Sequence, residues 1–211
     1  DGRRVVLDAK SKVIHVFLDG TAIDTRIQLP ESSTPQSFYV LENGETRYLV
    51  LDKTGAMIVN ANGEVVSRLS VDALGIHNDP SLRGAPQGDF DIYSACDGTS
   101  LVLLYGDTIT IAPATELERP RSFPLPDALR KETIYSISVR DGRILFATSN
   151  ALWTASAADP REVRELVRDE AGIEGAQFDG TGKILYLSRR KVERVRIKND
   201  GEINQYMESK N

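Results

Sequence analysis

The sequence predicts an all-β fold of repeated antiparallel sheets, and two observations carry this prediction. An Asn-Gly or Asp-Gly pair recurs along the chain, and each pair is followed within a few residues by an apolar run typical of a strand. These runs begin at Val5, Leu49, Leu101, Ile144 and Ile184, so they are 44, 52, 43 and 40 residues apart. Sequence periods of roughly 20–50 residues are typical of repeat architectures.

Each repeat contains four expected strands, which we name A to D. The Asn-Gly or Asp-Gly pair predicts the turn from A to B, because a tight hairpin turn needs positive φ, which Gly adopts freely and Asn or Asp tolerates. The pairs stand at Asp1-Gly2, Asn43-Gly44, Asp97-Gly98, Asp141-Gly142 and Asp179-Gly180. Strand B is the apolar run itself, and strands C and D follow it. Four strands every 40–45 residues is typical of the blades of a β-propeller.

The chain is therefore expected to be a single β-propeller domain over 1–211, or part of one, made of about five four-stranded blades. The expected blades are approximately 1–36, 37–88, 89–131, 132–172 and 173–211. The first lacks strand A, and we expect preceding sequence or another chain to supply a strand beside Val5–Asp8, unless the ring closes with a three-stranded blade. Two stacked sandwiches would also give short strands, but they would not need one four-strand phase.

Composition narrows the range of functions. The 211 residues include 26 Lys and Arg against 31 Asp and Glu, a formal charge of −5, so nucleic acid is not an expected partner. No apolar stretch reaches the ~20 residues of a membrane helix. Cys96 is the single cysteine and lies in an expected strand, where an inert, buried thiol is the default.

The first two repeats resemble NHL-type blades. In "VVLDAKSKVIHVFLDGTAIDTRIQL" and "YLVLDKTGAMIVNANGEVVSRLS", a strand ending in Asp precedes a second strand, an Asx-Gly turn and an outer strand. The later repeats have Tyr105, Thr148 and Ser188 in place of that Asp. The resemblance implies a propeller whose relatives mostly bind proteins, sugars, peptides or RNA, while a few six-bladed members are metal-dependent lactonases or hydrolases. It also favours an extracytoplasmic location.

The candidate binding residues lie in connections on one face. In a propeller, the B-to-C turns and D-to-A connections share the face where the central channel opens. The D-to-A connection over 71–90 is unusually long, and long loops are uncommon unless they are functional or disordered. A tolerated surface insertion is the alternative. The residues expected to contact a ligand are His77, Asn78, Asp79 and Arg83 from this connection, with Arg189 and Arg190 from the last B-to-C turn.

Catalytic motifs are absent from the sequence. The other histidine of the chain, His15, alternates with Val13 and Phe17 and is expected to be a hydrogen-bonded strand residue. The basic run "SRRKVERVRIK" suits either an acidic partner or a solvated outer strand. The prediction is a non-catalytic binding module for a protein, peptide or glycan, with no cofactor. The alternative is a metal-dependent hydrolase with calcium or another divalent cation in the channel.

Overall fold

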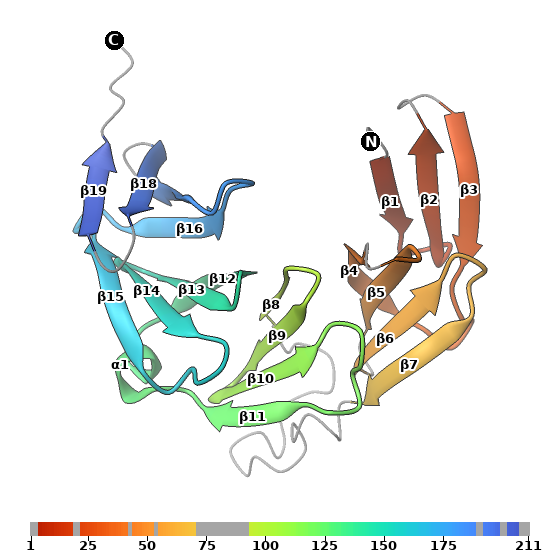
Figure 1. Ribbon diagram of the computed structural model, residues 1–211, viewed down its shortest axis with the longest axis horizontal. Coiled ribbons are helices and arrows are strands. Elements are labelled where there is room, and N and C mark those ends of the chain that lie inside the picture. The colour runs from red at the N-terminus through yellow and green to blue at the C-terminus, as the bar shows by residue number, and fades with distance from the viewer. Residues whose placement is uncertain are drawn as a thin grey trace. The chain divides into compact units, whose positions relative to one another are not determined.

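The computed structural model describes residues 4–18, 22–41, 44–52, 55–70, 93–188, 192–198 and 202–206, and only the backbone at 18, 22–24, 192–198 and 202–206. These residues form five antiparallel β-sheets, one of three strands and four of four strands (Figure 1). The three-stranded sheet comes first in the chain, as the missing strand A predicts. The predicted all-β class and its four-strand repeat are thus confirmed.

Consecutive strands pair within every sheet, in the order of the chain. The first sheet contains β1 (Arg4–Asp8), β2 (Val13–Leu18) and β3 (Ala22–Gln28). The second contains β4 (Pro35–Leu41), β5 (Arg47–Asp52), β6 (Gly55–Asn60) and β7 (Val65–Ser70). The third contains β8 (Tyr93–Cys96), β9 (Ser100–Tyr105), β10 (Thr108–Pro113) and β11 (Arg121–Pro124). The fourth contains β12 (Ile134–Arg140), β13 (Arg143–Thr148), β14 (Ala151–Ser156) and β15 (Val163–Arg168). The fifth contains β16 (Ile173–Phe178), β17 (Ile184–Ser188), β18 (Val192–Lys198) and β19 (Glu202–Tyr206).

The chain divides into two compact units. The first covers residues 1–90 and 112–120 and holds the first two sheets, and the second covers 91–111 and 121–211 and holds the other three. Whether they make a single domain stays a prediction. No helix within the described ranges is long and apolar enough to cross a membrane.

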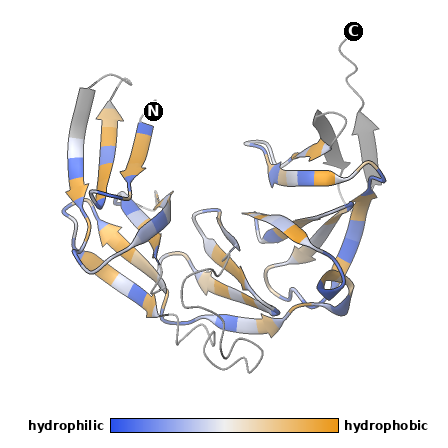
Figure 2. Ribbon diagram, turned by 180° about the vertical axis from the view of Figure 1, so that it is seen from behind, coloured by the Kyte–Doolittle hydropathy of each residue, from blue (hydrophilic) through white to orange (hydrophobic). Residues whose placement is uncertain are grey.

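The B strands contain continuous apolar runs, and Figure 2 shows the hydropathy of each residue along the sheets by colour. In β5, β9 and β13 the last five residues are all buried, on both faces of the strand. A strand buried on both faces needs a continuous apolar run rather than an alternating one. This explains why "YLVL", "LVLL" and "ILFA" are the clearest strand signals in the sequence.

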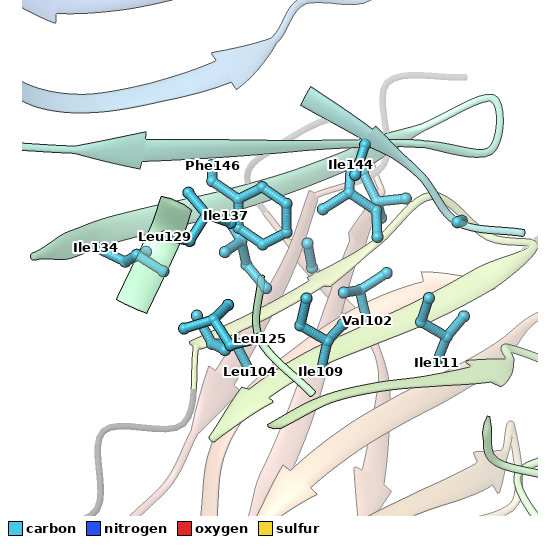
Figure 3. Close-up of a cluster of buried hydrophobic side chains, with 14 residues drawn as sticks. Val102, Leu104, Ile109, Ile111, Leu125, Leu129, Ile134, Ile137, Ile144 and Phe146 are labelled. Atoms are coloured by element: carbon cyan, nitrogen blue, oxygen red, sulfur yellow. The ribbon is translucent and has the colours of Figure 1, made fainter. Parts of the chain in front are cut away.

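One core cluster lies between the third and fourth sheets, in the second unit. Phe146 and Ile144 of β13 point toward Val102 and Leu104 of β9 (Figure 3). Ile109 of β10 belongs to the same cluster. Because alternate residues of a strand face opposite sides, Leu145 and Ala147 of β13 face the other way and pack with Ile184 and Tyr186 of the fifth sheet.

The first unit repeats this packing. Val5 and Leu7 of β1 pack against a cluster that includes Tyr48 and Val50 of β5, together with Ile14 and Val16 of β2 and Met57 and Val59 of β6. Within each unit, each sheet thus meets the next through one face of its B and C strands. Gly63 marks a close approach, since a Cβ there would lie 2.5 Å from the Gln28 carbonyl oxygen.

The A-to-B turns differ more than the recurring Asp-Gly pairs predict. Asp141 and Gly142 both have positive φ, +50° and +70°, and they join β12 to β13 as a two-residue turn. At Asp179-Gly180 the positive φ, +78°, belongs to Gly182 instead. The expected tight two-residue form is therefore wrong for the fifth repeat, because "DGTG" makes a longer turn closed by a hydrogen bond from the Asp179 amide to the Lys183 carbonyl, at 2.7 Å.

Candidate functional site

The six residues predicted to bind a ligand lie outside the described part of the chain. His77, Asn78, Asp79 and Arg83 fall in residues 71–92, and Arg189 and Arg190 fall in residues 189–191. Their role stays a prediction. Other B-to-C turns and D-to-A connections are described, and they show how that side of each sheet is built.

The same main-chain hydrogen bond ties each described B-to-C turn to the D-to-A connection of its own sheet. The amides of Leu29, Leu125 and Asp169 donate to the carbonyls of Lys12, Asp107 and Asn150, at 2.9, 2.7 and 2.8 Å. In the fourth sheet the turn is held further, because the Ser149 amide donates to Thr133 and the Ser149 carbonyl accepts from Ile173. These bonds make a repeated, rigid frame on this face.

In the first and fourth sheets, the residue that ends the B strand caps the following turn. Asp8 Oδ1 accepts hydrogen bonds from the amides of Lys10 and Ser11, at 3.1 and 3.0 Å. The bond from Ser11 is the largest cause that lowers the pKa of Asp8. Thr148 Oγ1 accepts from the Ala151 amide at 3.2 Å and donates to its carbonyl at 3.1 Å. Thr148 therefore keeps the capping function of the Asp it replaces, which the sequence comparison missed.

An ion-pair network lies beside the B-to-C turn of the fourth sheet. Arg168 Nε donates to Glu165 Oε1 at 3.1 Å, and its Nη1 donates to Asn150 Oδ1 at 3.2 Å. Its Nη2 also lies 3.6 Å from the Glu132 carboxylate, whose side chain is only 16% exposed. Hydrogen bonding to Glu165 is the main cause that raises the pKa of Arg168. The network links the end of β15 with two loops and leaves the guanidinium partly exposed.

A one-turn helix, α1 (Asp127–Arg130), places a second arginine on this face of the third sheet. Leu129 anchors the helix, since its side chain is fully buried. Arg130 lies 3.3 Å from the Asp127 carboxylate and 3.9 Å from that of Asp107 in the B-to-C turn. The sequence analysis gives no sign of this helix, because four helical residues are too few to produce a periodic signal.

The inner edge of β16 is covered by side chains of β12, the preceding A strand. Ser136 Oγ donates to the Ala176 carbonyl at 3.3 Å and accepts from its amide at 3.1 Å. Ser138 Oγ accepts from the Phe178 amide at 3.2 Å. Arg140 donates to the carbonyls of Asp179 and Gly180, at 2.6 and 2.7 Å. We call Ser136, Ser138 and Arg140 the β12 ladder, since these alternate residues satisfy main-chain groups on an open strand edge.

Two Asp residues of the A-to-B turns, Asp97 and Asp179, use their carboxylates within the turn. Asp97 Oδ1 accepts from the amides of Thr99 and Ser100, at 2.9 and 2.8 Å. Asp179 Oδ1 accepts from the amides of Thr181 and Lys183, at 2.7 and 3.0 Å. The Thr181 hydroxyl is the largest cause that lowers the pKa of Asp179. The interpretation as turns is confirmed for Asp97-Gly98, Asp141-Gly142 and Asp179-Gly180, whereas Asp1-Gly2 and Asn43 lie outside the described residues. Within the described residues, no three His, Cys, Asp or Glu residues gather as a metal site.

His15 lies in β2, as predicted, between Val6 and Arg26 of the flanking strands. The expectation that it is hydrogen-bonded is wrong at one atom, because Nδ1 is buried and makes no hydrogen bond in the described part of the chain. Cys96 ends β8, and its Sγ accepts from the Gly98 amide at 3.4 Å. Burial raises the pKa of the Cys96 thiol to about 11, which agrees with an unreactive thiol.

Comparison with solved structures places this arrangement among β-propellers. The chain is similar to a dihydro-heme d1 dehydrogenase, NirN, with 14% identity and a TM-score of 0.61, over 96% of this chain and 43% of that one. It is similar to a streptogramin B lyase, with 15% identity and a TM-score of 0.61, over 98% of this chain and 65% of that one. It is also similar to the WD40 β-propeller domain of Doa1, with 16% identity and a TM-score of 0.59, over 92% of this chain and 60% of that one.

No family model matches the chain, and no curated protein matches it in sequence. The structural neighbours nevertheless agree on the fold, so the chain is a β-propeller repeat protein. The NHL subtype is not confirmed. The chain spans less than two thirds of the length of the three neighbours named here, and at these identities the likeness shows the fold alone.

Proposed function

We propose that the protein is a non-catalytic binding module that recognises a protein, peptide or glycan through the face formed by its B-to-C turns and D-to-A connections. The observation that carries this proposal is the main-chain hydrogen bond repeated between turn and connection in three sheets. Loops held on a rigid scaffold are where binding residues are most often found. We propose that the long connection at 71–90 contributes to this face, because the fold does not require its extra length.

The polar side chains described on this face support recognition over catalysis. Arg130 and Arg168 are paired with neighbouring carboxylates and remain partly exposed. Such groups suit hydrogen bonding and charge complementarity with a partner surface. We propose that His77, Asn78, Asp79, Arg83, Arg189 and Arg190 supply the specific contacts. A strand from preceding sequence or from another chain, paired beside β1, is a further proposed partner.

Panning a random peptide library and probing a glycan array with the purified protein would test the proposal. The best peptide or glycan should lose at least tenfold in affinity when residues 75–86 are replaced by a short Gly linker, and when Arg189→Glu is combined with Arg190→Glu. Arg164→Glu, an exposed residue of β15, is the matched control and should bind like the parent. Unchanged binding by both loop variants, with thermal unfolding also unchanged, would reject this face as the site.

Metal analysis of the same protein separates the alternative, a hydrolase with calcium or another divalent cation in the channel. The proposal expects no stoichiometric metal after gel filtration. One equivalent of calcium or zinc that survives this step, and whose removal lowers the thermal unfolding temperature, would contradict a purely non-catalytic module.

A further inference from the structure

Two arginines face each other across the A-to-B turn of the fourth sheet. Arg140 ends β12 and Arg143 begins β13, and the two are direct partners in the strand register. Like charges directly opposite each other destabilise a pair of strands, so this arrangement calls for a compensating interaction. Both side chains extend toward the fifth sheet, where the turn over 179–182 lies beside them. All of these residues belong to the second unit.

Carbonyl groups of that turn hold Arg140 in place. Its Nη1 and Nη2 donate to the carbonyls of Asp179 and Gly180, at 2.6 and 2.7 Å. Its Nε is buried and donates no hydrogen bond in the described part of the chain, although a carboxylate oxygen of Asp141 lies 3.4 Å away. Buried donors without an acceptor are rare in folded proteins, and a bound ion is one cause. Arg140 is therefore a fixed cation with one donor left over.

Arg143 is held by an aromatic ring and keeps its donors. Its guanidinium lies over the Phe178 ring of β16, 5.3 Å from the ring centroid. Stacking of this kind orients a guanidinium but uses none of its N–H groups. Within the described ranges the Arg143 side chain makes no hydrogen bond or ion pair. The carboxylate of Asp179 is directed into its own turn, where Oδ1 accepts from two amides.

Gly182 leaves a space beside both guanidinium groups. A Cβ at this position would lie 3.6 Å from Arg143 Nη2 and 3.8 Å from Arg140 Nε, and its three nearest neighbours would all be atoms of these two arginines. The φ of Gly182 is +78°, a conformation that glycine adopts freely. A small group that enters this space would thus meet two positive charges and the unused donor of Arg140.

We propose that this corner of the molecule, formed by Arg140, Arg143 and Gly182, binds a phosphate group. Arginine binds phosphate oxygens through short, charge-assisted hydrogen bonds, and two guanidinium groups here supply the charge of two cations at one point. A tetrahedral phosphate presents oxygens to two separate guanidinium groups, whereas a planar carboxylate matches a single one. The corner lies at the A-to-B end of the strands, opposite the B-to-C turns, so the proposal is independent of the proposed binding function.

Titration of the protein with inorganic phosphate tests the proposal, with NMR detection of the arginine Nε–Hε signals and chloride holding the ionic strength constant. The signals of Arg140 and Arg143 should shift in a saturable manner, while the signal of Arg164, an exposed residue of β15, should stay unchanged. Acetate should bind at least fivefold more weakly. O-Phosphoserine in a second titration shows whether a phosphate monoester or the free ion is preferred, and saturable binding of either supports the proposal.

Two variants separate a built site from general attraction of anions. Arg143→Gln should weaken phosphate binding about tenfold and leave thermal unfolding nearly unchanged, because the side chain makes no described hydrogen bond within the protein. Gly182→Ala should weaken binding as much, since the methyl group fills the space. Gly44→Ala is the matched control. Its φ is +88° and a Cβ there meets nothing within 4 Å, so it shares the backbone strain and should bind phosphate like the parent.

Three outcomes would overturn the proposal. Shifts that chloride reproduces, or that grow linearly with phosphate, would show general screening of charge. Acetate binding as tight as phosphate binding would show an unselective cation. Unchanged phosphate affinity in Arg143→Gln would remove this corner as the site, and that variant decides the question even if Gly182→Ala fails to fold.

Discussion

Strand β1 of the first sheet and strand β13 of the fourth sheet occupy the same place in the repeat but meet different surroundings. Residues 144–147 of β13 are at most 1% exposed, on both faces of the strand. In β1 the exposure alternates, and Val6 is half exposed although it is as apolar as its neighbours. The repeat therefore encodes strands for burial on two sides, and neighbouring sheets decide whether that burial is realised.

The largest expected effect on stability comes from a substitution in β13, the strand that is buried on both faces. Phe146→Ala should lower the free energy of unfolding by about 3–5 kcal/mol, because it empties the centre of the cluster between the third and fourth sheets. Urea titration of both proteins measures the difference. Val66→Ala, at a residue 48% exposed, is the control and should change stability by less than about 0.5 kcal/mol. A loss below about 1 kcal/mol for Phe146→Ala would mean that these sheets are not packed as described.

The contact between the first two sheets is tested by a matched pair of glycines. Gly63 and Gly98 have nearly equal φ, +86° and +89°, but only Gly63 has a neighbour in the way, the Gln28 carbonyl. Gly98→Ala should cost about 1–2 kcal/mol for the left-handed backbone alone. Gly63→Ala should cost about 1–3 kcal/mol more, since the added methyl group displaces β3. Similar losses in thermal unfolding for both variants would show that β3 does not lie against this turn.

The β12 ladder predicts a smaller effect, confined to the fourth and fifth sheets. Arg140→Met keeps the aliphatic stem but removes the hydrogen bonds to Asp179 and Gly180, so stability should fall by roughly 1–2 kcal/mol. Hydrogen exchange should also become faster in β16 and stay unchanged in β9. Arg164→Met, which removes an exposed charge from β15, serves as the control. No change in the exchange of β16 would argue against the ladder.

The smallest expected effect is a change in the pKa of Asp159, which lies in an exposed turn outside the packed faces of the sheets. Hydrogen bonding to Arg161 lowers the pKa of Asp159 to about 2. A lowered folded pKa stabilises the protein above the ordinary value near 3.9, and this contribution is lost as the pH falls through about 2. NMR titration should show the pKa of Asp159 returning toward about 3.9 in Arg161→Gln. A titration unaffected by this substitution would place the cause elsewhere.

The repeat itself could be predicted from the sequence because its signals are local. Turn residues and apolar runs mark strands directly, and the missing strand A followed from the first pair standing at Asp1-Gly2. The turn caps and the β12 ladder could not be predicted from the sequence. Thr148 and Ser136 act through hydrogen bonds to atoms whose positions depend on the turn and on the next sheet.

The exposure of Val6 also could not be predicted from the chain alone. Its sequence context is the same kind of apolar run that is buried in β5, β9 and β13, so local sequence does not account for the difference in exposure. For the proposed binding face, the long connection and the last B-to-C turn stay predictions from the sequence, and the structure adds Arg130 and Arg168 as further candidates. Their roles depend on ion pairs with Asp127 and Glu132, which sequence spacing alone does not define.

The most direct test compares Val50→Ala with Val6→Ala, since both remove the same two methyl groups from the same position of the repeat. Val50 is fully buried and Val6 is 49% exposed. In the 1–211 protein, urea unfolding should show a loss of about 1.5–3 kcal/mol for Val50→Ala and less than about 0.5 kcal/mol for Val6→Ala. Equal losses for the two variants would contradict the account, because they would mean that Val6 and Val50 are buried alike.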